Sequence, residues 1–220
     1  IIEEVELLPP NYGEVQVKLG ACSICHSDIL YAEGAWGGDL PAVYGHEAAG
    51  VVSDVGAGVT NVKKGDHVLV TLIRSCGRCH YCSQGHKVQC DSVFPLDENS
   101  PLRTSEGEFI KHGLRTAAFA ESVVVDSSQV VSIPKEISLE SASVLSCGVI
   151  TGFGAVVNTA KIQSGCSVVV MGTGGVGLNS IQGASITGAE SIIALDLVDE
   201  KLEAAKKFGA THAVNISREK

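Results

Sequence analysis

Short apolar runs separated by turn residues dominate the chain up to about residue 140. Each run is rich in β-branched residues and is bounded by Gly, Pro, Asp or Asn, a pattern typical of strands joined by tight turns. We expect strands at VQVKLG (15–20), AAGVVSDVG (48–56), DHVLVTL (66–72), FAESVVVD (119–126) and VVSIP (130–134). Two irregular stretches interrupt them, a cysteine-rich lobe at about 75–91 and a segment from about 91 to 115. This part of the chain is therefore predicted to be β-rich.

The pattern changes near Ser138, which is a candidate N-cap for a helix. Strand and helix patterns then alternate, with Gly209 placed to end the last helix. We expect a helix at 138–160, a short buried strand at 167–172, a helix at 174–188, a strand at 191–196, an amphipathic helix at 199–210 and a third strand at 212–215. Such alternation is typical of a parallel sheet, so the fold class is predicted to be α/β. We place the boundary between a β-rich domain, 1–140, and a doubly wound domain, 141–220.

Composition and charge exclude some classes of partner. The net charge is −9, whereas nucleic acids and anionic membranes require clustered Lys and Arg. No run approaches the roughly 18 apolar residues of a membrane helix. The chain opens with Ile1 and stops at Lys220 within an αβ pattern, so we expect it to be part of a longer protein, with a targeting segment before Ile1 left open.

Four of the eight cysteines lie close together in the run CGRCHYCSQGHKVQC. Closely spaced thiolates of this kind form a tetrahedral four-sulfur shell around Zn²⁺, with no position left for water. The predicted structural zinc ligands are Cys76, Cys79, Cys82 and Cys90.

Disulfides are the alternative for these cysteines. A secreted disulfide scaffold would be shorter and less apolar than this chain, with its cysteines spread through loops. We therefore favour metal-bound thiolates in a reducing compartment, which indicates a cytoplasmic protein. The two cysteines left over, Cys22 and Cys166, are expected to be packing residues.

A glycine loop follows the predicted strand at 167–172 and opens the next helix. In this setting G-x-G-x-x-G is the dinucleotide fingerprint, in which the helix N-terminus receives the pyrophosphate. Asp196 ends the next strand, where a carboxylate binds the ribose hydroxyls and repels a 2′-phosphate, which favours NAD over NADP. Lys201 either reaches the ribose or lies on a solvated helix face. The loop residues predicted to bind the cofactor are Gly172, Gly174, Gly175, Val176 and Gly177. The alternative is a glycine-rich turn without a ligand.

A second set of possible metal ligands is scattered along the chain. Cys25 lies in CSICHSD, His46 and Glu47 lie in YGHEAAG, and Cys147 lies in LSCGVITG. Taken singly, a cysteine is more often a small core residue and a His-Glu pair is more often a surface feature.

Taken together and in this order, the motifs resemble those of the zinc-dependent medium-chain alcohol dehydrogenases. The resemblance extends from CSICHSD through GHE, the cysteine lobe and SCG to GTGGVG. It implies a GroES-like catalytic domain followed by the start of a Rossmann domain, two Zn²⁺ per chain, NAD as cofactor, and hydride exchange with a primary or secondary alcohol or the matching aldehyde or ketone. It also implies a small-molecule substrate and a homodimer or homotetramer.

The resemblance assigns roles to residues at matching positions. Cys25, His46 and Cys147 correspond to the three protein ligands of the catalytic zinc, a site type that carries a fourth, open position. Glu47 corresponds to an acid that approaches the metal during ligand exchange. Asp28 corresponds to the carboxylate that orients the metal-bound imidazole.

Further positions belong to the cofactor and the substrate. Ser27 corresponds to the hydroxyl that passes on the alcohol proton, and His26 to a basic residue near the pyrophosphate. Thr151 corresponds to a residue packed by the nicotinamide. Trp36 and Leu72 fall where the family lines its substrate pocket, although a lone Trp is as often a core residue.

The chain departs from the family pattern in two places. Many relatives carry a histidine where this chain has Leu30, so the proton relay must end in water, in a ribose hydroxyl or in another side chain. The branch that oxidises the glutathione adduct of formaldehyde carries acidic pocket residues where this chain has Gly34 and Trp36, so that branch ranks as an alternative function. An alternative of another class is a zinc-ribbon interaction module without catalysis, which the acidic charge and the glycine loop oppose.

Overall fold

The structure is a computed structural model that describes residues 1–218. The chain divides into two compact units, one from Ile1 to Ser146 and one from Cys147 onward. The expected boundary between 140 and 141 falls inside α4 (Leu139–Ser143), which packs on β2 and β4 of the first unit.

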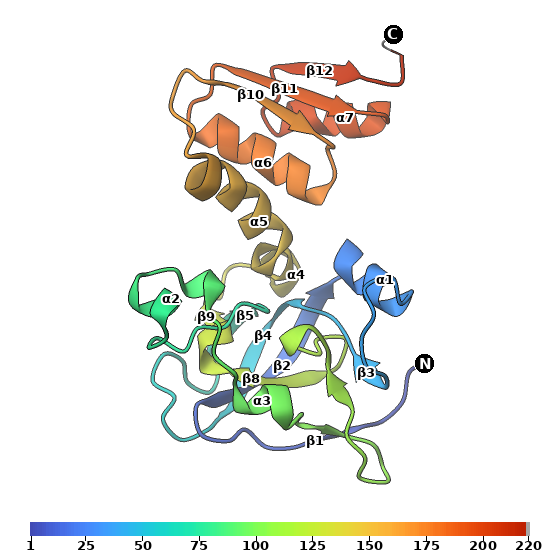
Figure 1. The fold of residues 1–220 in the computed structure, drawn as a ribbon, viewed down its shortest axis with the longest axis vertical. Helices are drawn as coiled ribbons and strands as arrows, with labels where there is room; N and C mark the ends of the chain where they lie inside the picture. The colour runs from blue at the N-terminus through green and yellow to red at the C-terminus, as the bar shows by residue number, and fades with distance from the viewer. Residues whose placement is uncertain (219–220) are drawn as a thin grey trace. The chain divides into compact units, whose positions relative to one another are not determined.

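The first unit is built on an antiparallel five-stranded sheet (Figure 1). The strand order is β8-β2-β4-β5-β9, with β2 at Glu14–Ser23, β4 at Glu47–Val55, β5 at His67–Val70, β8 at Ser122–Asp126 and β9 at Val130–Ser132. All five strands lie within or next to the β-branched runs that predicted them. Val, Ile and Thr are stiff at χ1 and pack well on a pleated surface, which is why these runs form strands.

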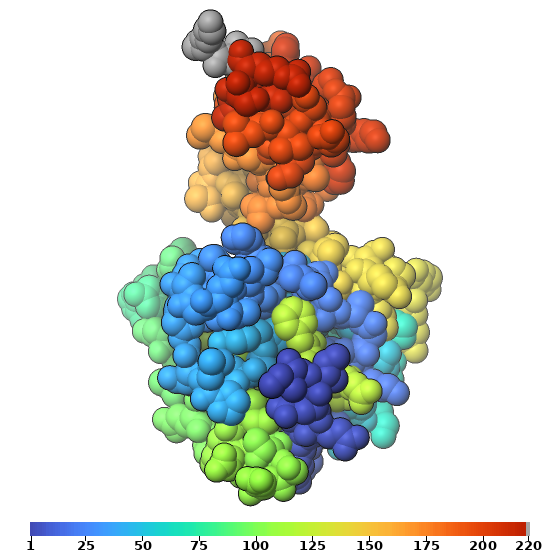
Figure 2. All heavy atoms as spheres, turned by 90° about the vertical axis from the view of Figure 1, so that its right-hand side faces the viewer, coloured from blue at the N-terminus to red at the C-terminus, as the bar shows by residue number. Residues whose placement is uncertain are grey.

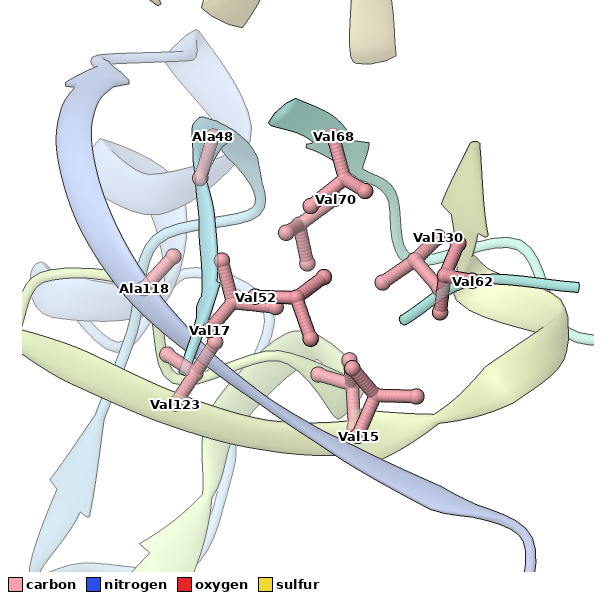
Figure 3. Close-up of a cluster of buried hydrophobic side chains, with 11 residues drawn as sticks. Val15, Val17, Ala48, Val52, Val62, Val68, Val70, Ala118, Val123 and Val130 are labelled. Carbon is pink, nitrogen blue, oxygen red and sulfur yellow. The ribbon is translucent and has the colours of Figure 1, made fainter. Parts of the chain in front are cut away.

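Alternate side chains of these strands meet in a core made almost entirely of valine (Figure 3). Val15, Val17, Val68 and Val70 are fully buried. Complete burial of a Val side chain contributes about 1.5–3 kcal/mol, so this core fixes the strands that lead to the candidate site.

Short elements surround the sheet and fill the two irregular stretches. The helices are α1 (His26–Ala32), α2 (His80–Ser83), η1 (Lys87–Gln89), α3 (Pro95–Glu98), η2 (Gly113–Arg115), η3 (Ser127–Gln129) and η4 (Val144–Ser146). The strands are β1 (Glu6–Leu7), β3 (Ala42–Val43), β6 (Leu102–Arg103) and β7 (Lys111–His112). The chain start lies on the surface of this unit, dark blue in Figure 2, with Ile1 and Ile2 exposed.

The second unit contains the predicted parallel sheet, in the order β10-β11-β12. Its elements are β10 (Ser167–Met171), α6 (Gly175–Ile186), β11 (Ser191–Asp196), α7 (Asp199–Lys207) and β12 (His212–Asn215). Ile192 and Ala194 point to one face of β11 and pack against both helices, so α6 and α7 cover the same face.

One prediction for this unit is wrong. The strand at 167–172 is not buried, because Val169 and Met171 are 53% and 82% exposed. Only the face of β10 that carries Val168 and Val170 packs against the core of the unit.

The expected helical segment at 138–160 is confirmed, but it is not continuous, because the chain breaks at Cys147. Ser138 does cap α4, accepting a hydrogen bond from the backbone N–H of Ser141. Cys147 has φ −143° and ψ −72°, outside the helical region, and a new helix, α5 (Gly148–Gly154), begins after it and continues as η5 (Ala155–Ala160). The apolar pattern continues through this break, which is why the break could not be predicted from it.

No single helix within residues 1–218 is long and apolar enough to cross a membrane, although the two helical segments on either side of Cys147 reach that length and composition when taken together.

Candidate active site

The four bunched cysteines form a compact sulfur cluster in the first unit. The sulfur atoms of Cys76, Cys79, Cys82 and Cys90 all lie within 4.8 Å of one another. Cys79 begins α2 as its N-cap, and Cys90 follows η1. The two short helical turns thus bring the fourth sulfur back to the first three.

Hydrogen bonds to sulfur stabilise negative charge in this cluster. The Cys76 sulfur accepts from the hydroxyl of Ser92 at 3.0 Å and from the backbone N–H of Cys79 at 3.2 Å. With the Ser92 hydrogen bond as the largest cause, the pKa of Cys76 falls to about 6. Burial raises the pKa of Cys82 to about 12 when no cation is close. Four close thiolates require a cation, and a closed sulfur shell of this kind fits Zn²⁺.

The scattered ligand candidates meet in a second cluster. The ligand-type atoms of Cys25, His46, Glu47 and Cys147 all lie within 4.8 Å of one another. Cys25 lies between β2 and α1, His46 and Glu47 lie at the start of β4, and Cys147 is bonded to Ser146, the last residue of the first unit. His46 and Glu47 are buried, at 1% and 6% exposure.

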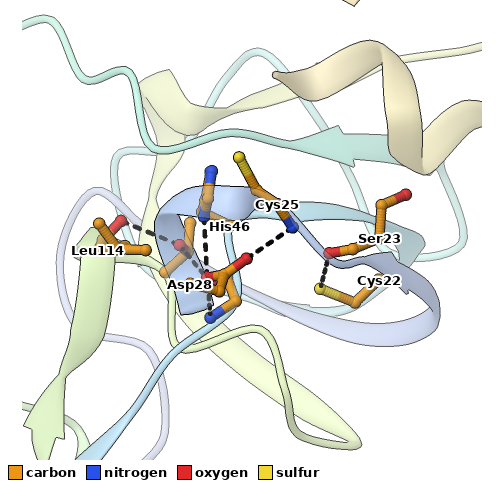
Figure 4. A network of polar contacts seen from close by, with 8 residues as sticks. Cys22, Ser23, Cys25, Asp28, His46 and Leu114 are labelled. Atoms are coloured by element: carbon orange, nitrogen blue, oxygen red, sulfur yellow. Dashed lines mark hydrogen bonds and ion pairs between the residues drawn. The ribbon is translucent and has the colours of Figure 1, made fainter. Parts of the chain in front are cut away.

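A buried carboxylate organises this second cluster (Figure 4). Asp28 Oδ1 lies 3.1 Å from His46 Nδ1 and accepts a hydrogen bond from the backbone N–H of Gly45 at 3.0 Å. Asp28 Oδ2 accepts from the backbone N–H of Cys25 at 2.9 Å. Figure 4 shows the Cys25 sulfur and the outer nitrogen of the His46 ring directed away from Asp28 toward the same side. One carboxylate therefore orients two possible ligands and leaves His46 Nε2 available to a metal.

The donor sets of the two clusters differ in kind. Two sulfurs and one imidazole with a neighbouring carboxylate match a catalytic zinc site that has an open position, whereas four sulfurs match a closed structural site. The residues present fit zinc in both places.

A cavity of about 610 Å³ lies in the first unit next to the segment that carries His46. Its wall includes Tyr44, Leu114 and the predicted pocket residue Leu72. The Thr116 hydroxyl donates to the Gly45 carbonyl oxygen at 2.8 Å and also lies 3.0 Å from the Leu114 carbonyl oxygen, which ties the cavity wall to the residue before His46. The further lining is mixed. Its apolar or aromatic side chains are Tyr31, Leu40, Pro41, Leu96, Phe109 and Ile110, and its polar or charged ones are Asp39, Asp97, Glu98, Ser100, Lys111, His112 and Arg115.

The residues predicted to serve the cofactor, the proton relay or the substrate pocket outside the metal cluster are exposed or half-buried. Trp36 is 56% exposed and packs edge-on against Tyr31 outside the cavity lining, and the ring centroids of the two residues are 5.5 Å apart. Ser27 is half-buried and His26 is exposed, both in the first turn of α1. Thr151 lies in α5 of the second unit.

Two buried basic residues, Arg74 and His112, were not predicted from the sequence. Arg74 is 3% exposed, forms an ion pair with Asp97 and lies over the Phe94 ring. His112 lines the cavity, and burial followed by the Arg74 charge lowers its pKa to about 4. Arg74 follows an apolar run and His112 follows Lys111, and neither setting is a specific signal of a buried base.

The glycine loop of the second unit has the shape that a phosphate requires. Gly172 has φ +87°, in the left-handed region. A Cβ on Gly177 would lie 1.9 Å from the Gly172 carbonyl oxygen, so only glycine permits this close packing. At Gly174 and Gly175 a Cβ would meet nothing within 4 Å, so the space in front of the helix N-terminus is open to a ligand.

Asp196 is held against this loop. Its Oδ2 accepts hydrogen bonds from the Thr173 backbone N–H at 2.7 Å and the Thr173 hydroxyl at 3.0 Å. Its Oδ1 accepts from the N–H groups of Leu197 and Val198. These bonds, that from the Thr173 N–H first, lower the pKa of Asp196 to about 2 and keep a fixed negative charge beside the loop. Lys201 is exposed on α7.

Two family models match the chain. The alcohol dehydrogenase GroES-like domain matches residues 11–135, and the zinc-binding dehydrogenase model matches residues 175–220.

Curated relatives and solved structures agree with these models. Alcohol dehydrogenase 1 of Pisum sativum is 40% identical over 98% of this chain and 59% of its own length. A zinc-binding-domain alcohol dehydrogenase from Burkholderia ambifaria superposes with a TM-score of 0.92 at 36% identity, over 97% of this chain and 60% of that one. Benzyl alcohol dehydrogenase from Acinetobacter calcoaceticus superposes with a TM-score of 0.88 at 33% identity, over 98% of this chain and 60% of that one.

The chain spans about 59% of the length of the curated relatives that it matches. Over that span, the GroES-like match, the relatives along nearly the whole chain and the two fitted ligand clusters agree. The chain therefore belongs to the zinc-dependent medium-chain alcohol dehydrogenase family.

Proposed function

We propose that the protein to which this chain belongs is a zinc-dependent oxidoreductase that transfers hydride between NAD and a primary or secondary alcohol, or the matching aldehyde or ketone. One observation carries this proposal. Cys25, His46 and Cys147 are far apart in sequence, yet their ligand-type atoms lie within 4.8 Å of one another.

In this proposal Cys25, His46 and Cys147 hold the catalytic zinc, which supplies Lewis-acid polarisation of the substrate oxygen. Asp28 fixes the tautomer and orientation of His46 by accepting from Nδ1. Glu47, buried beside these atoms, is available to take part in ligand exchange.

The proton of the alcohol needs its own acceptor. We assign this step to Ser27 Oγ, a half-buried hydroxyl two residues beyond Cys25. Leu30 carries no titratable group, so the proton leaves Ser27 by a route other than that side chain.

The remaining cofactor sites follow from the other clusters. We assign a second, structural zinc to Cys76, Cys79, Cys82 and Cys90. The open glycine loop, together with the Asp196 charge, supports NAD over NADP because that carboxylate repels a 2′-phosphate. Since each Asp196 oxygen already accepts two hydrogen bonds, we base this preference on charge more than on new bonds to the ribose.

The cavity supports a larger alcohol than ethanol. Its volume of about 610 Å³ exceeds the space that ethanol needs, and its Tyr, Leu and Phe side chains suit an aromatic or branched group, while its charged and polar side chains suit further polar groups on the alcohol. One structural relative is a benzyl alcohol dehydrogenase, which agrees with this size class.

A substrate panel on the full-length protein tests the proposal. With NAD as oxidant, kcat/KM for benzyl alcohol and cyclohexanol should exceed that for ethanol by about tenfold or more, about 1.4 kcal/mol. Leu72→Phe should narrow this difference, whereas Val131→Phe, at an exposed position on β9, should not. NAD reduction with none of these alcohols would contradict the proposed function.

The glutathione-adduct branch ranks below this proposal, since the chain has Gly34 and Trp36 where that branch carries acids. Matches to dehydrogenases along 98% of the chain favour an enzyme over a zinc-ribbon interaction module. The homodimer or homotetramer and the cytoplasmic location stay predictions.

A further inference from the structure

The residue that precedes Cys147 is held by two hydroxyl groups. The Ser146 carbonyl oxygen accepts a hydrogen bond from Thr71 Oγ1 at 2.9 Å. The Ser146 hydroxyl donates to the Ser143 carbonyl oxygen at 2.6 Å. Ser143 and Ser146 are each 2% exposed, so water does not compete for these groups.

A second hydroxyl contact joins this segment to the strand that leads to Cys25. Ser143 Oγ donates to the Glu140 carbonyl oxygen at 2.9 Å and lies 2.9 Å from Ser23 Oγ. Since Ser143 has one hydroxyl proton and uses it on Glu140, Ser23 donates to Ser143. Ser23 is the last residue of β2, two positions before Cys25.

We propose that Thr71, Ser143 and Ser23 are positioning residues that set the separation of the Cys25 and Cys147 sulfur atoms. This inference rests on the proposed catalytic zinc site.

These contacts lie where the chain passes from one helix to the next. Ser146 ends a short 3₁₀ turn, and Cys147, whose φ and ψ are non-helical, is the N-cap of α5 and accepts a hydrogen bond from the Thr151 backbone N–H at 2.9 Å. Zinc–ligand distances in protein sites lie within about 0.2 Å of their standard values, so the positions of the ligand sulfurs matter. Asp28 contacts Cys25 and His46, and the contacts of Thr71 and Ser23 connect the segment just before Cys147 to the same sheet.

Thr71 is itself held by two hydrogen bonds to Gln129. The Thr71 backbone N–H donates to the Gln129 carbonyl at 3.0 Å, and the Thr71 carbonyl accepts from Gln129 Nε2 at 2.8 Å. Gln129 is fully buried. The Thr71 hydroxyl therefore links the end of β5 to Ser146 through one hydrogen bond.

Zinc release from the full-length protein tests this proposal. A chelator with a coloured zinc complex should report two phases in the wild type, one for each site. Thr71→Val and Ser143→Ala should accelerate one phase by roughly 10–100-fold and leave the sulfur-cluster phase unchanged. The ligand-field spectrum of the protein loaded with Co²⁺ should shift in the same variants.

Two controls separate positioning from general destabilisation. Ser141→Ala removes an exposed hydroxyl from the same helix, α4, and should leave both phases unchanged. Thr71→Ser keeps the hydroxyl and should restore slow release. If Ser143→Ala does not fold, Ser23→Ala removes the same contact from its half-buried side and should give the same acceleration.

The possible failures can be told apart. One outcome is that the wild type shows two phases while folded Thr71→Val and Ser143→Ala release zinc at the wild-type rates and give the wild-type Co²⁺ spectrum. That result would overturn the positioning role but not the proposed catalytic zinc site. Equal acceleration of both phases would also overturn it, since that result indicates a loss of overall stability. A wild type that releases zinc only from the sulfur cluster would overturn the proposed catalytic site and this inference together.

Discussion

The two candidate metal clusters are assembled in opposite ways. The sulfur cluster takes all its ligands from the stretch between Cys76 and Cys90, and neighbouring backbone N–H groups donate to its sulfurs. The second cluster brings together Cys25, His46 and Cys147 from distant parts of the sequence, and the buried Asp28 contacts the first two. A local cluster needs only short loops to close, whereas a dispersed cluster exists only when the whole unit is folded.

This difference predicts different consequences when each cluster is damaged. The local cluster contributes to folding its own lobe, since the two turns around it have few other contacts to hold them. The dispersed cluster is supported by a valine core and by Asp28, so its loss should remove activity more than structure.

The largest effect is expected in the lobe. Cys79→Ala should remove one zinc per chain and unfold residues 75–91, because a structural zinc contributes on the order of 10 kcal/mol to folding such a segment. Hydrogen exchange across the lobe, with zinc analysis, measures this. Cys166→Ala, at a half-buried cysteine outside both clusters, is the control. Slow exchange and full zinc content in Cys79→Ala would count against a closed structural site.

The next effect concerns activity. Cys147→Ser should lower kcat/KM at least about 10³-fold, since polarisation by the metal supplies several kcal/mol. NADH binding, followed by fluorescence, should change little, because the glycine loop lies in another part of the chain. Cys166→Ser serves as the control, and near-native turnover in Cys147→Ser would show that this cysteine is not a ligand.

Acid should destabilise the first unit, which carries Cys25 and His46. The pKa of His112 is lowered from 6.5 to about 4, so below pH 6.5 the unfolded chain binds more protons than the folded chain. This contribution is complete above pH 6.5 and decreases as the pH falls toward 4, by roughly 3 kcal/mol in total. His112→Gln should flatten the curve of unfolding free energy against pH in this window. If the curves of the variant and the wild type were parallel, the lowered pKa of His112 would not be the source of the pH dependence.

The smallest effect concerns cofactor choice. Asp196→Ala should reduce the preference for NAD over NADP by roughly tenfold, because removing a solvent-screened negative charge is worth about 1 kcal/mol. Steady-state kinetics with both cofactors measure the ratio. Glu200→Ala, an exposed acid on α7, is the control for net charge. An unchanged ratio in Asp196→Ala would place the discrimination elsewhere.

Much of the fold could be predicted because its signals are local. β-branched runs bounded by turn residues predicted β2, β4, β5, β8 and β9, and the glycine loop between a strand and a helix predicted α6. The break at Cys147 has no such signal, since the apolar pattern continues through it. The exposure of Val169 depends on which face of β10 the helices cover, which only the tertiary structure shows.

The two candidate metal clusters also differ in how far they could be predicted from the sequence. The spacing of Cys76, Cys79, Cys82 and Cys90 predicted a cluster without reference to any relative. The dispersed set depended on family resemblance, because no pattern in the residues alone joins Cys25 to Cys147. Thr71 and Ser143 were missed entirely, since a buried hydroxyl that supports a ligand has the same sequence signature as any polar residue in a turn.

Zinc analysis of the full-length protein, paired with X-ray absorption at the zinc edge, tests the central claim most directly. Wild type should contain two zincs per chain, and Cys147→Ser should lose one and retain a zinc surrounded by four sulfurs. A wild type with one zinc in an all-sulfur shell, unchanged in Cys147→Ser, would contradict the convergence of Cys25, His46 and Cys147 on a metal.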